Sequence, residues 1–114
     1  MRYLLLIAGE ESVANAPSPE GEGMSPEYAE FMKDLAERGI LQGGDRLRPT
    51  TDATTVRVRE GEVLTTDGPF AETKEQLGGF FLLDCKDLDE AIEVASKVPT
   101  AKIGSIEVRP IWEM

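Results

Sequence analysis

Residues 66–80 read TDGPFAETKEQLGGF, and the organisation of the chain can be worked out from this stretch. The pattern before it and the apolar residues after it predict two strands, which this stretch connects. Gly68 can adopt backbone conformations that other residues avoid, while Pro69 fixes its own φ and restricts the residue before it. Asp67 is suited to accept a hydrogen bond from a nearby backbone N–H. Two interpretations stay open: a rigid structural turn, or a fixed carboxylate at the mouth of a cleft.

Four stretches have the pattern of strands in one sheet: residues 2–8, 40–48, 79–85 and 105–112. The first and third are apolar on both faces, which is typical of central strands covered above and below. The second contains Gly43 and Gly44, which predict a bulge or a place where something approaches the backbone closely. The fourth alternates, so that Glu107 and Arg109 share one of its faces.

A further pair of strands, residues 54–59 and 62–66, alternates cleanly and predicts a hairpin between the second and third strands of the sheet. Glu60-Gly61 joins them as a two-residue turn. That turn sets Val58 opposite Val63, and an apolar pair in register supports the prediction.

The first helix is predicted to begin at Ser25 as its N-cap, with Pro26 in the first helical position and Gly39 as the left-handed stop. Residues 9–24, which precede it, are rich in Glu, Ser, Pro and Gly and have no apolar period. We expect a solvated surface loop there, with a mobile lid as the alternative. The predicted buried stripe of this helix is Tyr28, Phe31, Met32, Leu35 and Ala36.

The second helix is predicted from a capping box, in which Asp87 caps the helix and Glu90 reaches back to the cap. This helix should end before Pro99. Its predicted buried stripe is Leu88, Ala91, Ile92 and Ala95.

Apart from the hairpin, the predicted order is β-α-β-β-α-β, the ferredoxin-like arrangement of a single α+β domain over residues 1–114. Two helices cover only one face of a four-stranded sheet. Because the strands at 2–8 and 79–85 are apolar on both faces, the second face would expose a larger apolar patch than monomers usually carry. We therefore expect a homodimer in which two sheets pack face to face and polar residues between them line a cleft.

The sequence DGPF at 67–70, followed by AETKEQLGGF at 71–80, resembles the signature of the DGPF-domain branch of the YCII-related family. Residues 1–7, 53–57 and 104–111 are similar to that family as well, so the resemblance covers nearly the whole chain. It implies a ferredoxin-like subunit in a dimeric α/β-barrel. YCII-related proteins of the simpler branch look like enzymes built on a His–Asp pair, but this chain contains no histidine, so half of that pair has no counterpart here.

Composition limits the chemistry that the chain can perform. Twelve basic and 22 acidic residues give a net charge of -10, which disfavours binding to nucleic acid. The apolar runs are too short to span a bilayer, and the N-terminus does not resemble a signal peptide. The single cysteine, Cys85, fits a reducing cytoplasm and is expected to be a buried, inert thiol. No metal site or cofactor is predicted, since histidine is absent and no phosphate-binding glycine loop occurs.

Asp67 is the partner that we expect for Arg109, because a carboxylate and a planar guanidinium can pair through two hydrogen bonds. One interpretation is a structural ion pair that holds the dimer together. In the other, Asp67 is a base or anchor and Arg109 holds a small anionic molecule. Lys74 is a second candidate cation. The predicted ligand-binding residues are Asp67, Gly68, Pro69, Phe70, Lys74, Glu107 and Arg109.

Two hypotheses of function follow from these residues. In the first, the protein is a dimeric small-molecule-binding or regulatory module with a cleft at its interface. In the second, it is an enzyme that uses Asp67 for acid–base chemistry while Arg109 holds an anionic substrate. The sequence favours the first, because it lacks a complete catalytic constellation, and it does not decide whether any reaction is catalysed.

Overall fold

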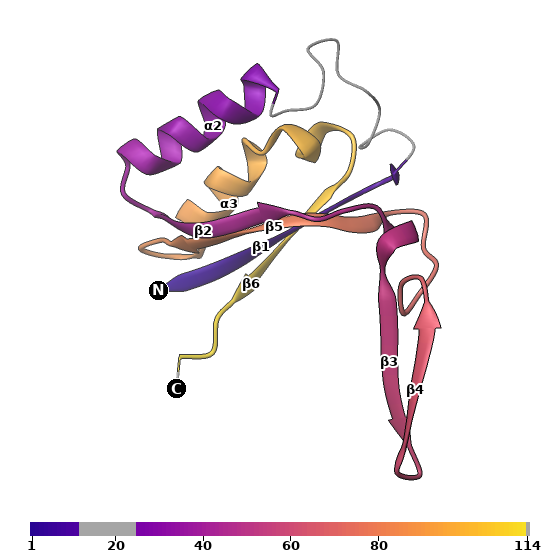
Figure 1. Cartoon of the computed structure of the whole chain (residues 1–114). Helices are drawn as coiled ribbons and strands as arrows, with labels where there is room; N and C mark the ends of the chain where they lie inside the picture. The colour runs from indigo at the N-terminus through magenta and orange to yellow at the C-terminus, as the bar shows by residue number, and fades with distance from the viewer. Residues whose placement is uncertain (12–24, 114) are drawn as a thin grey trace.

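The computed structural model describes residues 1–11 and 25–113 of the chain (Figure 1). Most of the loop predicted over residues 9–24 lies outside the described residues. The strands are β1 (Arg2–Gly9), β2 (Leu41–Arg46), β3 (Thr54–Arg59), β4 (Glu62–Asp67), β5 (Gln76–Asp84) and β6 (Ser105–Pro110). The helices are α2 (Pro26–Glu37) and α3 (Leu88–Ser96), and two short 3-10 helices, η1 (Thr50–Asp52) and η2 (Pro99–Lys102), lie between β2 and β3 and between α3 and β6.

Four strands form the main sheet in the order β2-β5-β1-β6, and every neighbouring pair is antiparallel. With α2 between β1 and β2 and α3 between β5 and β6, this confirms the mixed α+β prediction and is consistent with a ferredoxin-like fold. Both helices cover the same face of the main sheet (Figure 1). The opposite face, which we call the open face, has no helix on it in the described part of the chain.

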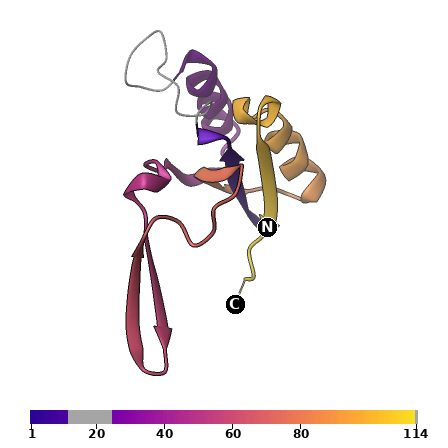
Figure 2. The same ribbon diagram turned by 90° about the vertical axis from the view of Figure 1, so that its right-hand side faces the viewer.

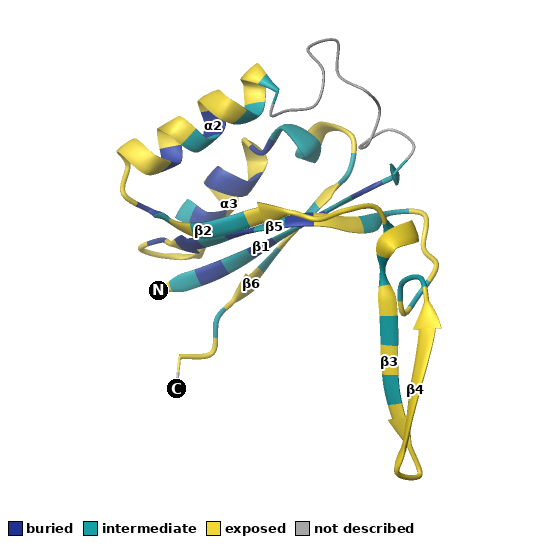
Figure 3. Cartoon of the chain, viewed as in Figure 1, coloured by how far each residue is buried: buried dark blue, intermediate teal, exposed yellow. Residues whose placement is uncertain are grey.

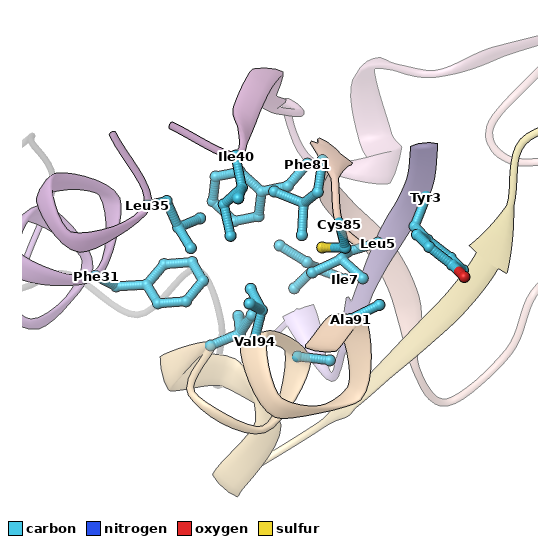
Figure 4. Packing of buried hydrophobic residues seen from close by; sticks show 13 residues of the cluster. Tyr3, Leu5, Ile7, Phe31, Leu35, Ile40, Phe81, Cys85, Ala91 and Val94 are labelled. Carbon is cyan, nitrogen blue, oxygen red and sulfur yellow. The ribbon is translucent and has the colours of Figure 1, made fainter. Parts of the chain in front are cut away.

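The core lies between the two helices and the covered face of the main sheet (Figure 4). Leu5 from β1, Leu35 from α2 and Val94 from α3 are almost fully buried there. Phe31 and Phe81 meet edge to face, with ring centroids 5.5 Å apart and an interplanar angle of 65°. Along β1, buried residues alternate with half-buried ones, so a single chain fully buries only one face of this strand (Figure 3).

The predicted start and end of α2 are confirmed. The side-chain oxygen of Ser25 accepts a hydrogen bond from the backbone N–H of Tyr28 at 3.3 Å, and Pro26 begins the helix. Gly39 follows with a φ of 72°, the left-handed conformation that ends many helices. Of the predicted stripe, Phe31 and Leu35 are buried, Tyr28 and Met32 are half-buried, and Ala36 is exposed.

Asp87 caps α3 as predicted, because its side chain accepts a hydrogen bond from the N–H of Glu90 at 2.9 Å. The Glu90 carboxylate accepts from the N–H of Lys86 at 3.0 Å, one residue before the cap. The predicted stripe is wrong at Leu88 and Ile92, which are exposed. Two overlapping apolar stripes run along this helix, and packing on the sheet selects the second of them: Ala91, Val94 and Ala95, with buried Val98 just after the helix.

The bulge predicted at Gly43 and Gly44 is confirmed, since the pairing of β2 with β5 shifts register just before Gly43. A Cβ atom on Gly44 would lie 2.7 Å from the carbonyl oxygen of Phe80 and 2.7 Å from Cδ1 of Phe81. The two backbones therefore approach too closely for a side chain at this position.

The hairpin of β3 and β4, which we call the arm, is confirmed with Val58 opposite Val63. Glu60 and Gly61 both have positive φ, 51° and 81°, as a tight two-residue hairpin turn favours. The arm forms a separate two-stranded sheet, and it extends away from the main sheet on the side opposite to the helices (Figures 1 and 2). The arm therefore stands on the same side of the molecule as the open face.

Candidate functional site

The open face carries an apolar strip along its two central strands. Leu4 and Leu6 of β1 lie opposite Leu82 and Phe80 of β5, and residues directly opposite one another in an antiparallel pair share a face. All four are half-buried in the single chain, whereas their neighbours in sequence on the covered face are buried. The strip is the apolar second face that the sequence predicts.

Charged residues flank this strip on the two edge strands. On β6, Glu107 and Arg109 lie opposite the two leucines of β1, and on β2, Asp45 lies opposite Phe80. Glu107 and Arg109 therefore share the open face, as the sequence predicts. Nη2 of Arg109 forms an ion pair with Oε2 of Glu107.

Asp67 and Arg109 do not contact each other within one chain. Asp67 ends β4 opposite Thr54, at the base of the arm, and is exposed. It forms no ion pair with the residues that the structure describes, and Arg109 pairs with Glu107 instead. The reason is that Asp67 belongs to the arm and Arg109 to the main sheet, and the arm extends away from that sheet (Figure 1). Their pairing across two copies of the chain stays a prediction.

The turn after β4 closes the base of the arm. Gly68 has a φ of 100°, which a residue without a Cβ adopts readily. Its N–H donates to the carbonyl oxygen of Ala53 at 2.7 Å, and its own carbonyl accepts from the Thr55 hydroxyl at 2.8 Å. Nη2 of Arg57 donates to the carbonyl oxygen of Phe70 at 3.4 Å. The turn segment thus lies against the face of the arm that carries Thr55 and Arg57, which supports a structural role for the turn.

The rest of the predicted segment is tied to the end of the main sheet. Pro69 is half-buried, and exposed Lys74 forms an ion pair with Glu10, just after β1, at 3.3 Å. The Glu75 carboxylate accepts a hydrogen bond from the hydroxyl of Ser105, the first residue of β6, at 2.7 Å. These contacts place the segment where β1 ends and β6 begins.

Cys85 is almost fully buried, and this burial, together with the negative charge of Glu90, raises the pKa of its thiol. A protonated, buried thiol is a poor nucleophile, as the sequence predicts. Within residues 1–11 and 25–113, no group of three or more His, Cys, Asp or Glu side chains is placed to hold a metal ion. Over the same residues, no helix is both long and apolar enough to cross a membrane.

Two open depressions of the described surface include none of the predicted site residues. One, of about 300 Å³, lies between α3 and β6. The other, of about 500 Å³, is formed by the two ends of the chain and is lined in part by Trp112.

Trp112 lies beyond the last strand and is 88 % exposed. The next residue, Glu113, is bound to β1, because Nε of Arg2 donates a hydrogen bond to Oε1 of Glu113 at 2.8 Å. The sequence pattern predicts that Trp112 lies in the last strand, but β6 ends at Pro110. Proline has no backbone N–H to donate to a neighbouring strand, and this was the feature of the sequence that could have predicted the end of β6.

Taken together, one chain presents a binding surface on its open face. The surface offers an apolar strip, a paired cation and anion, and a second carboxylate at Asp45.

Comparison with known proteins assigns a family. The YCII-related domain family matches residues 1–114. The chain belongs to the YCII-related family. An uncharacterized protein of Rhizobium meliloti (strain 1021) is 45% identical to this YCII-related chain, in an alignment that covers 97% of the chain and 92% of that protein. The resemblance in the sequence is thereby confirmed at the level of the family, and the relative's name gives no activity.

Proposed function

We propose that this YCII-related protein belongs to the DGPF branch and is a dimeric small-molecule-binding module, with the ligand held between two open faces. The observation that carries the proposal is the apolar strip of Leu4, Leu6, Phe80 and Leu82 with charged residues along its sides. The DGPF sequence at 67–70 supports the assignment to that branch.

The dimer is supported by the exposure of this strip. Burying apolar surface stabilises by about 25 cal/mol per Å², so a face with four half-buried large side chains favours association with a matching face. A two-fold dimer pairs the same surface of both chains, and the open face provides apolar residues in its middle and charged residues at its sides.

A small anionic ligand is supported by the surroundings of Arg109. Its ion pair with Glu107 is made through Nη2, and a guanidinium has five N–H donors in all, so further donors are available to a carboxylate or phosphate. Asp67, Gly68, Pro69 and Phe70 would border the ligand from the base of the arm, and Lys74 would border it from the segment beside the ends of β1 and β6. In a low-dielectric space between two sheets, the attraction between Arg109 and such a ligand would be stronger than in water.

Binding is favoured over catalysis because one chain does not bring Asp67 and Arg109 together. The alternative, acid–base chemistry at Asp67 with a substrate held by Arg109, would need the second copy to supply one of the two residues. We also infer a cytoplasmic location, which is supported by the single cysteine and its burial as a thiol.

Native mass spectrometry of the wild type and Arg109→Gln tests the proposal. We expect the wild type to be a dimer with an additional small mass, and R109Q to be a dimer that has lost it. Arg48→Gln is the matched control, since Arg48 is exposed beyond the end of β2, where it pairs with Asp52 at 2.9 Å, and this variant should keep the mass. A monomeric wild type would contradict the dimer. A dimer without bound mass, which also fails to bind small carboxylates and phosphates in calorimetry, would contradict the ligand site.

A further inference from the structure

The arm has two unlike faces. Pairing of β3 with β4 places Val58 opposite Val63 and puts Val56 on the same face, two residues along β3. The other face carries Thr55 and Arg57, and the turn segment after the arm covers it through the two hydrogen bonds described above. The chain therefore covers one face of its own arm and leaves the valine face bare.

The bare valine face is unusual for a stable hairpin. Val58 is 58 % exposed and Val63 is 68 % exposed in the single chain. An isolated two-stranded hairpin is at best marginally stable in water, and β-branched residues stabilise strands chiefly when other side chains pack on them. The radius of gyration is 15.9 Å, whereas a compact domain of this length has about 13 Å, so the arm stands away from the body of the domain. These observations indicate that the arm packs on another molecule.

We propose that the arm reaches along a second copy of this chain, so that its valine face is covered by the partner and the arm closes one end of the space between the two sheets. This inference rests on the dimer proposed above. The arm extends on the side of the open face, so a copy seated on that face lies beside it (Figures 1 and 2). Each arm strand has six residues and is about 20 Å long, while stacked sheets lie about 10 Å apart. The arm is therefore long enough to extend past the partner's sheet.

The site between the sheets is incomplete without these arms. The base of each arm, with Asp67, stays beside its own main sheet, while the tip, with Val58 and Val63, extends to the partner. The strip and Arg109 form the floor of the site on each chain. Two arms related by a two-fold axis then form its end walls and exclude water from it, which strengthens the electrostatic interactions inside.

A double variant, Val58→Asp with Val63→Asp, tests the inference through the dissociation constant of the dimer, measured by sedimentation over a dilution series. Two valines on each of two arms, four in all, are covered in the proposed dimer, and a contribution of about threefold from each gives an expected loss of about a hundredfold. Thr66→Asp is the matched control, because Thr66 is exposed on the other face of the same arm. This control should leave the constant within about threefold of the wild type.

Leu6→Asp, on the strip, separates the inference from the dimer itself. If the wild type is a dimer and V58D/V63D binds as tightly, the arm proposal is overturned and the face-to-face dimer stands. If V58D/V63D dissociates while L6D remains dimeric, the arm holds the copies together and the face-to-face packing is wrong. If the wild type is a monomer at every concentration, both proposals are overturned.

Hydrogen exchange of the wild-type protein tests the arm proposal if the double variant fails to fold. In the wild type, amides of residues 54–67 should exchange more slowly in a concentrated sample than in one diluted below the dissociation constant. Equal exchange of these amides in both samples, while the sample sediments as a dimer when concentrated, would overturn the arm proposal.

Discussion

Replacing Gly104 with alanine should disrupt the start of β6, the strand that carries the charged pair of the open face. A Cβ atom on Gly104 would lie 2.2 Å from the carbonyl oxygen of Ala8 and 3.1 Å from Cα of Gly9. Both neighbours are backbone atoms at the end of β1, so no change of rotamer relieves the contact and the two strands must separate locally. Overpacking of this kind costs about 1–3 kcal/mol, and separation also weakens the pairing of Ser105 with Ala8, at about 1 kcal/mol per hydrogen bond. We expect the free energy of unfolding to fall by about 3 kcal/mol.

Urea unfolding followed by far-UV circular dichroism measures this change. The samples should have one fixed protein concentration, because the stability of a dimer depends on it. In a thermal scan the same loss corresponds to a Tm lower by roughly 10 °C. Gly78→Ala is the matched control: it makes the same chemical change in the same sheet, but the atom nearest to its Cβ would be 3.9 Å away, an ordinary contact. We expect this control to stay within about 0.5 kcal/mol of the wild type.

The outcome that refutes the reasoning is a G104A protein that unfolds at the same urea concentration as wild type and G78A. The backbone around Gly104 would then have room for a methyl group, and the close approach of β6 to β1 would not fix the position of the charged pair. A loss of stability in both variants alike would indicate a general cost of replacing glycine in this sheet, which would also contradict the argument from close contact.

Three further predictions follow from the described residues. Leu35→Ala, which removes a side chain that is 1 % exposed, should lower the free energy of unfolding by about 2–5 kcal/mol in the same urea assay. Hydrogen bonds from Lys97 and Arg38 hold the pKa of Glu93 below its ordinary 4.5. As the pH falls below about 4.5, Glu93 therefore takes up a proton more readily in the unfolded chain than in the folded chain. The stability that this carboxylate contributes is lost as the pH falls through its folded pKa. Glu93→Gln should accordingly flatten the acid side of a plot of stability against pH, and an unchanged slope would contradict this. Cys85 should react with iodoacetamide slowly in native protein and rapidly in urea, as followed by mass spectrometry, because burial protects it and raises the pKa of its thiol. Fast native labelling would contradict the burial.

Features that depend on a few neighbouring residues could be predicted from the sequence. The cap at Ser25, the cap at Asp87 and the turn at Glu60-Gly61 each involve partners within four positions, and all three are confirmed. The order of the strands in the main sheet also follows from a pattern, because few topologies accommodate the β-α-β-β-α-β order. Local chemistry and the order of the elements therefore decide most of this fold.

Features that depend on the orientation of whole elements could not be predicted in the same way. Exposed Leu88 and Ile92 belong to an apolar stripe as regular as the one that α3 buries, and only contact with the sheet selects between the two stripes. The partner of Arg109 depends on the direction in which the arm leaves the sheet, which η1 and the turn at Gly68 set together. The alternation of β6 nevertheless placed Glu107 and Arg109 on one face, since that requires only the period of a strand.

The charge of the chain indicates which of its surfaces can hold two copies together. Two chains that each have a net charge of -10 repel at long range, so apolar burial must outweigh this repulsion at contact. The open face can provide this apolar burial, because the middle of the face is apolar and its two arginines already have carboxylate partners in the same chain. Arg2 pairs with Glu113, and Arg109 pairs with Glu107. Arg2 is held by both oxygens of its partner, at 2.8 and 3.0 Å, whereas Glu107 engages one nitrogen of Arg109. An anion that enters between the sheets would therefore bind the remaining N–H donors of Arg109, beside Glu107.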